Sequence, residues 1–154
     1  MRLWHKNMIP YLPQQQLLGQ WRELCCIATN LANEHTPNHL LVNPILDYPP
    51  EHFEYYCSLV VREMRKRDIS ITDTVMKTLQ NNIRAWRIYL DQEVPFNFVD
   101  LDIEMQFDHD KLFKDWHNER YLEQCYCNLE EKYDRGGIPQ KEWERFCCWY
   151  YRKG

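Results

Sequence analysis

Apolar residues recur at intervals of three and four along most of the chain, which is the spacing of one face of an α-helix. The first such helix is predicted to follow Pro13 and to run to about Asn33. Its inward stripe consists of Leu17, Trp21, Leu24, Ala28 and Leu31. The broad opposite face carries Gly19, Glu23, Cys26 and Asn30. Further prolines then predict a long ordered loop from Asn33 to Pro50.

The same spacing predicts two more helices after this loop. One begins at Pro50 and ends near Arg67, and its inward positions are Phe53, Tyr56, Cys57, Val60, Val61 and Met64. The next is capped by Thr72 or Asp73. Its apolar face consists of Val75, Leu79, Ile83 and Trp86.

The last third of the chain is predicted to hold two helices. One spans roughly residues 111–133, with a potential break near Asn118, and ends before Gly136-Gly137. A short final helix opens at Pro139. Because no segment has the alternation of a strand and no repeat is visible, the pattern predicts an all-α fold. We expect a single compact helical domain, residues 1–154, of four to five helices with long loops.

Composition narrows the class of protein. The chain has 154 residues, 44% apolar and 14% aromatic, which fits one globular domain and argues against disorder. No stretch approaches the roughly 18 consecutive apolar residues of a membrane helix, and the start lacks the apolar run of a signal peptide. We therefore expect a cytoplasmic protein that makes no membrane contact.

Charge is unevenly distributed along the chain. The net charge of −4 by itself argues against a nucleic-acid binder, but residues 91–110 carry seven acids and no Lys or Arg, and removing that −7 leaves the rest at +3. Basic residues cluster at Arg62, Arg65, Lys66 and Arg67. This cluster fits either the C-terminus of a helix, where cations are favourable, or a DNA contact.

Seven cysteines raise the questions of disulfides and metal. Their number is odd and two pairs are adjacent in sequence, which predicts reduced thiols. A zinc site is the alternative, but the chain has no C-x-x-C pair, and Cys125-x-Cys127 with His117 does not have the usual spacing of zinc ligands. Pro37 interrupts the i, i+4 pair His35 and His39. No metal or cofactor is expected.

Few motifs in the chain carry chemistry. There is no glycine-rich phosphate loop and no serine-nucleophile motif. The C-terminal tail interleaves aromatic and basic residues, which can stack on bases and pair with phosphates. Helical spacing of Trp143, Phe146 and Tyr150 fits a hydrophobic core equally well, so both interpretations stay open.

Two segments carry a resemblance to a known family. Met1-Arg2-Leu3-Trp4-His5 is followed by Leu17-Leu18-Gly19-Gln20-Trp21-Arg22-Glu23-Leu24, and further on come His39-Leu40-Leu41-Val42-Asn43 and Met64-Arg65-Lys66-Arg67-Asp68. These segments resemble the pyrimidine-dimer DNA glycosylase/AP lyase family, which includes phage endonuclease V. The similarity is clearest over residues 1–73.

The resemblance implies a mechanism and its residues. In this family the chain's α-amino group attacks the sugar of a damaged nucleotide and forms a Schiff base. Met1 and Glu23 would be the catalytic residues here, since the large Arg2 predicts that Met1 is retained. An α-amine suits this role because its ordinary pKa, about 7.7–8.0, leaves an appreciable neutral fraction at physiological pH. The proposed DNA contacts are Arg2, His5, Arg22, His39, Trp149, Tyr150, Arg152 and Lys153.

The resemblance implies damaged double-stranded DNA as the partner, bound by a monomer. The phage-type enzyme has cationic positions where this chain has Gln16 and Cys26, so fewer cations would face the DNA. Two alternatives remain open. One is a non-catalytic helical protein that keeps the fold and binds a protein partner, and the other is an AP lyase with a different lesion specificity.

Overall fold

The computed structural model describes residues 1–91, 101–102 and 105–153, and the secondary structure in these ranges is entirely helical. The all-α prediction is confirmed. Of the helices in the described ranges, none has the length and apolar character needed to cross a membrane. The elements are the α-helices α1 (Gln14–Glu34), α2 (Pro50–Lys66), α3 (Asp73–Tyr89), α4 (Glu119–Asp134) and α5 (Gln140–Arg152), with the 3-10 helices η1 (Lys6–Tyr11), η2 (Asn43–Asp47) and η3 (His109–Lys111).

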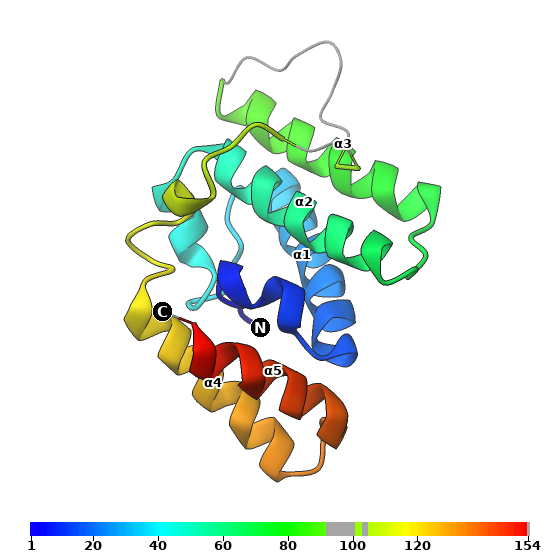
Figure 1. The fold of residues 1–154 in the computed structure, drawn as a ribbon. Coiled ribbons are helices and arrows are strands. Elements are labelled where there is room, and N and C mark those ends of the chain that lie inside the picture. The colour runs from blue at the N-terminus through cyan, green and yellow to red at the C-terminus, as the bar shows by residue number, and fades with distance from the viewer. Residues whose placement is uncertain (92–100, 103–104, 154) are drawn as a thin grey trace.

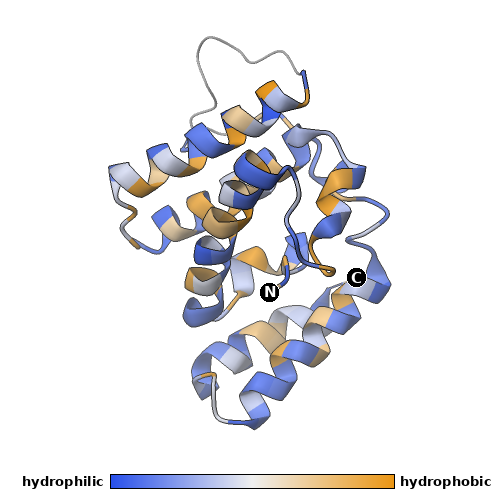
Figure 2. Cartoon of the chain, turned by 180° about the vertical axis from the view of Figure 1, so that it is seen from behind, coloured by the Kyte–Doolittle hydropathy of each residue, from blue (hydrophilic) through white to orange (hydrophobic). Residues whose placement is uncertain are grey.

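The helices form two groups that meet at the start of the chain (Figure 1). In one group, α1 packs against α2 and α3, and in the other, α4 and α5 form a hairpin. The helix η1 lies between the groups and contacts both α2 and α5. Figure 2, seen from behind, shows that each helix carries both apolar and polar positions, as expected for helices with one buried side.

The first two long helices follow the predicted pattern. All five predicted inward residues of α1 and all six of α2 are buried. The bounds also agree within a residue or two, since α1 begins directly after Pro13 and α2 begins at Pro50. The basic cluster ends α2, where Arg67 donates hydrogen bonds to the carbonyls of Pro10 and Leu12. Arg67 thus has a structural role at the helix C-terminus.

The prediction for α3 is wrong at one position. Thr72 caps the helix, as expected, by accepting a hydrogen bond from the amide of Val75. The side chain of Val75 is exposed, and Met76 is buried in its place. Because Val75 lies in the first turn, held by its capped amide, the buried stripe begins one residue later and continues through Leu79, Ile83 and Trp86.

The predicted start of the fourth helix at residue 111 is wrong, whereas the break indicated near Asn118 is confirmed. The helix α4 begins at Glu119, because the Asn118 side chain accepts a hydrogen bond from the amide of Tyr121 and caps it. Residues 112–117 form turns, in which Phe113 adopts a left-handed backbone (φ 46°). Phe113 is fully buried all the same, so its apolar character reflects core packing in a turn.

The two predicted connections contain more structure than expected. The segment from Asn33 to Pro50 includes η2, which has Pro44 in its first turn. In the acidic segment 91–110, residues 92–100 and 103–104 lie outside the described ranges. Asp102 of this segment forms an ion pair of 2.8 Å with Arg65, so the acidic segment reaches the basic cluster of α2.

Candidate active site

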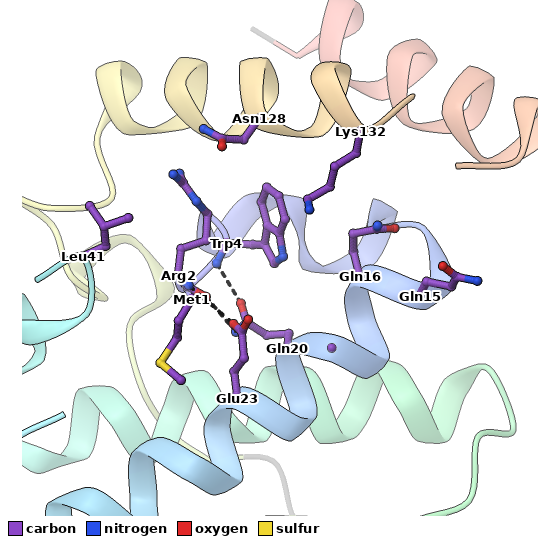
Figure 3. A pocket seen from close by; sticks show the side chains of 11 residues that line it. Met1, Arg2, Trp4, Gln15, Gln16, Gln20, Glu23, Leu41, Asn128 and Lys132 are labelled. Atoms are coloured by element: carbon purple, nitrogen blue, oxygen red, sulfur yellow. Dashed lines mark hydrogen bonds between the residues drawn. The ribbon is translucent and has the colours of Figure 1, made fainter. Parts of the chain in front are cut away.

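A cavity of about 400 Å³ opens between α1 and α4 and is closed on one side by the start of the chain (Figure 3). The N-terminal half of α1 contributes one wall and α4 contributes the facing wall. The lining residues are Met1, Arg2, Trp4, Gln15, Gln16, Gly19, Gln20, Glu23, Leu41, Asn128 and Lys132.

Glu23 brings a carboxylate to the first peptide unit of the chain. Its Oε2 accepts hydrogen bonds from the backbone N–H of Arg2 at 3.4 Å and from Nε2 of Gln20 at 3.3 Å. Only the Cα and carbonyl carbon of Met1 separate its amino nitrogen from that Arg2 N–H. Met1 is 42% exposed and lines the cavity with Glu23. The structure thus places the two predicted catalytic residues side by side.

Gln20 orients both the chain start and Glu23. Its side chain is 1% exposed and forms four hydrogen bonds. The oxygen accepts from the N–H of Trp4 at 2.7 Å and from the hydroxyl of Tyr56 at 2.8 Å. The nitrogen donates to the carbonyl of Arg2 at 3.0 Å and to Glu23. Because a buried polar side chain is costly unless paired, this arrangement fixes the backbone of residues 2–4 against α1.

The helix α4 holds the other side of the same segment. The hydroxyl of Tyr121 donates to the carbonyl of Leu3 at 2.5 Å, and Arg2 Nη1 lies 3.8 Å from Cys125 Sγ, as donor to the sulfur. Burial raises the pKa of both Tyr121 and Cys125. Tyr121 therefore remains a hydrogen-bond donor, and Cys125 remains a neutral thiol that packs beside Arg2.

Buried basic residues anchor the segment that follows. His5 is 3% exposed, accepts a hydrogen bond from the N–H of Asn7 at Nδ1, and donates from Nε2 to the carbonyl of His117 at 3.0 Å. Burial lowers the pKa of His5 to about 4. Lys6 Nζ donates to the carbonyls of His109, Asp110 and Leu112. His5 is therefore engaged in contacts within the protein, and its DNA contact stays a prediction.

The remaining predicted DNA contacts lie outside the cavity, except for Arg2. Arg22 is exposed on α1 and donates to the carbonyl of Leu18, one turn earlier. His39 is half-buried in the turn before η2, where its Nδ1 accepts a hydrogen bond from the N–H of Leu41. The sequence did not single out Lys132, a cation that lines the cavity from α4.

The aromatic tail is packed against the protein itself. Trp149 stacks on Tyr11 with ring centroids 4.7 Å apart, and Tyr150 stacks on Tyr126 at 4.1 Å. Lys153 Nζ lies 4.3 Å from the ring centroid of Tyr150. A second hollow of about 360 Å³ lies here, lined by Tyr11, Arg145, Cys148, Trp149, Arg152 and Lys153.

The missed positioning residues had weak sequence signals. Gln20 precedes Glu23 by three residues and so shares its helix face, which is a signal that a closer analysis of α1 finds. Tyr121 and Lys132 are more than 100 residues away from the chain start, so no local pattern connects them to it.

All seven cysteines are free thiols. Over the described part of the chain, no three side chains of the His, Cys, Asp and Glu types come together as a metal site.

Comparison with known proteins assigns the chain to a family. A sequence model of the family described as pyrimidine dimer DNA glycosylase matches residues 1–77. The matched half of the chain contains Met1, Gln20, Glu23, Leu41 and Tyr56. No curated protein and no solved structure gives a significant match. The chain belongs to the pyrimidine dimer DNA glycosylase family, a family of DNA-repair enzymes.

Proposed function

We propose that this chain is a DNA glycosylase with AP lyase activity, in which the α-amino group of Met1 is the nucleophile and Glu23 is the acid and base. The observation that carries the proposal is the Glu23 carboxylate, which accepts a hydrogen bond from the Arg2 N–H at the mouth of a cavity lined by Met1. A nucleophile beside a proton acceptor in a cavity is the arrangement that covalent catalysis requires.

The first half of the reaction replaces the base by the amine. The lone pair of the Met1 nitrogen forms a bond to C1′ of the damaged nucleotide, and the bond between C1′ and the base breaks with its electrons going to the base. The Glu23 carboxylate stabilises the positive charge that develops on the sugar and accepts a proton from the amine. The sugar ring then opens as its oxygen takes this proton from Glu23, which regenerates the carboxylate, and C1′ and nitrogen are joined as an iminium.

The second half breaks the strand. Glu23 removes a proton from C2′, and the electrons of that bond expel the 3′ phosphate from C3′. Hydrolysis of the Schiff base then frees the amine. Gln20 supports both steps by holding the Glu23 carboxylate and the Arg2 carbonyl in fixed positions. Each step uses only protein groups and water.

Cations near the cavity support DNA as the substrate. Arg2 and Lys132 line it, and Arg22 is exposed on α1. In the tail, Arg152 and Lys153 line the second hollow and are proposed to contact phosphates. The rings of Trp149 and Tyr150 are stacked within the protein, so we assign DNA contact in the tail to the two cations. Binding that rests on these contacts weakens steeply as salt rises.

Borohydride trapping tests this function. Protein with a free Met1 amine is mixed with duplex DNA that carries an abasic site or a cyclobutane pyrimidine dimer. We expect an adduct that maps to the Met1 α-amine and is absent when that amine is acetylated. Glu23→Gln should fold normally and lose about 10²–10⁴-fold in strand cleavage. Glu34→Gln, at the other end of α1, is the control and should retain activity.

Each result distinguishes the alternatives. Trapping on the dimer indicates a glycosylase, whereas trapping on the abasic site alone indicates a lyase with a different lesion specificity. Folded protein with a free amine that traps neither DNA would contradict the catalytic proposal and favour a non-catalytic binding protein. Full cleavage activity in Glu23→Gln would exclude Glu23 as the acid and base.

A further inference from the structure

Two adjacent leucines stand out from the surface in the turn that links α1 to η2. Leu40 is 84% exposed and Leu41 is 47% exposed, whereas the next residue, Val42, is fully buried. Val42 anchors this turn in the core, whereas the side chain of Leu40 does not pack against the core. A single exposed leucine is ordinary, so its place and its rigidity decide whether it has a role.

The turn is held rigidly by hydrogen bonds between its two ends. The carbonyl of His39 accepts from the N–H groups of Val42 at 2.9 Å and Asn43 at 2.8 Å. In return, the N–H of His39 donates to Oδ1 of Asn43 at 3.1 Å. The His39 ring then accepts from the N–H of Leu41 at 3.2 Å. Leu40 therefore stands at the tip of a fixed turn.

This turn borders the candidate active site. Leu41 lines the cavity with Met1, Arg2 and Glu23, and Figure 3 shows it at the end of the cavity near Arg2. The proposed function puts the sugar of the damaged nucleotide at the Met1 amine, so the cations Arg2 and Lys132 are available to its phosphates and the Leu40–Leu41 turn to its neighbouring bases. An apolar tip in that position faces the base stack.

We propose that Leu40, supported by Leu41, is a wedge that enters the base stack of the damaged duplex beside the nucleotide held in the cavity. This inference rests on the proposed function of the same site. Apolar side chains inserted between base steps unstack and kink a duplex. Unstacking costs a few kcal/mol, and contact between leucine and the faces of the bases offsets part of that cost.

Substrates that differ only in stacking test the wedge. One is a fully paired duplex with an abasic site next to 2-aminopurine, whose fluorescence rises on unstacking. The other carries the same abasic site in an unpaired bubble. Leu40→Ala should trap the paired duplex about tenfold more slowly, equivalent to about 1.4 kcal/mol, and should lose the fluorescence rise. On the bubble it should match the wild type within about twofold, since no stacking has to be broken.

Two variants serve as controls. Leu40→Met keeps a long apolar side chain and should restore both the trapping rate and the fluorescence rise. Ile88→Ala removes an exposed apolar side chain from α3 and should behave as the wild type. Equal trapping by Leu40→Ala and the wild type on the paired duplex, or an equal loss on both substrates, would overturn the wedge while leaving the Schiff-base chemistry intact. Failure of the wild type to trap either DNA would instead overturn the proposed function.

Discussion

Gln20 illustrates how one side chain fixes a reactive geometry. It accepts two hydrogen bonds and donates two, which uses the full capacity of a primary amide in donors and two lone pairs. A carboxylate in its place has no hydrogen to donate to the Arg2 carbonyl or to Glu23, and an apolar side chain pairs with none of the four groups. The position therefore requires an amide for chemical reasons.

Removing this amide should affect both stability and catalysis. Gln20→Ala leaves the N–H of Trp4 without its buried acceptor and the carbonyl of Arg2 without its donor, whereas the Tyr56 hydroxyl keeps the carbonyl of Trp4 as an acceptor. We therefore expect a loss of about 2–4 kcal/mol in the free energy of unfolding. Chemical denaturation measures this loss. Trapping of an abasic site by the folded variant should also slow, because the Glu23 carboxylate loses a hydrogen bond that orients it.

Gln15→Ala is the matched control for this prediction, because Gln15 is a glutamine of the same helix that lines the same cavity but is exposed. Its unfolding free energy should stay within about 0.5 kcal/mol of the wild type. If Gln20→Ala traps DNA as fast as the wild type once folded, the proposed positioning role is wrong and Gln20 acts on stability alone.

At the scale of the element, α4 connects the tail half of the chain to the site. Tyr121 and Cys125 hold the chain start, and Asn128 and Lys132 line the cavity. These four residues are spaced by three or four positions, so one face of the helix makes every contact. The place where α4 begins therefore matters for the site, and Asn118 determines it.

Asn118→Ala removes the cap of α4 and should lower the free energy of unfolding by about 1 kcal/mol. For a chain of this size the loss corresponds to a fall in Tm of about 2–4 °C, which thermal denaturation followed by circular dichroism detects. Asn118→Asp keeps an acceptor for the Tyr121 N–H and places a negative charge at the helix N-terminus, so it should remain near the wild type. Equal destabilisation by both variants would contradict the capping role.

The same helix marks the limit of sequence-based prediction. The inward residues of α1 and α2 follow from spacing alone, because each stripe packs on one continuous core. Leu112 and Phe113 extend the apolar pattern of α4 backwards although they are buried in turns, so periodicity placed the start too early. At the site, the family resemblance was enough to pair Met1 with Glu23, but the contacts from α4 arise only from tertiary folding.

At the scale of the whole molecule, the start of the chain joins the two groups of helices. Residues 2–4 pair with Gln20 and Tyr56 on one side and with Tyr121 on the other. His5 and Lys6 extend these contacts to His117, in the turns that precede α4. We call residues 2–6 and their partners in the two groups of helices the seam. Opening the seam would expose two neutral imidazoles, those of His5 and His117, to protons.

The seam should make stability depend on pH. Burial lowers the pKa of His5 to about 4 and lowers the pKa of His117 well below its usual range. In the unfolded chain a histidine titrates near pH 6.5. As the pH falls from about 6.5 to 4, protons bind the unfolded chain and not the folded one, so stability present above pH 6.5 is lost. His5 alone accounts for roughly 3 kcal/mol.

Chemical denaturation at several pH values between about 7.5 and 4.5 checks this dependence. His5→Gln keeps a donor that can reach the His117 carbonyl but has no proton to gain in the unfolded chain, so its stability should fall less steeply over this range. His39→Gln is the control for the loss of an imidazole from the half-buried turn before η2. A His5→Gln curve parallel to that of the wild type would contradict the assignment.

The seam also has a consequence for synthesis on the ribosome. Leu3, His5 and Lys6 find their partners more than 100 residues later, in His117 and Tyr121. A nascent chain that has reached only α3 already carries Met1, Gln20 and Glu23, but it lacks the carbonyls that accept the Lys6 ammonium group. The proposed nucleophile and its carboxylate are thus close in sequence, but their final arrangement depends on contacts made by residues 109–121, which are translated much later.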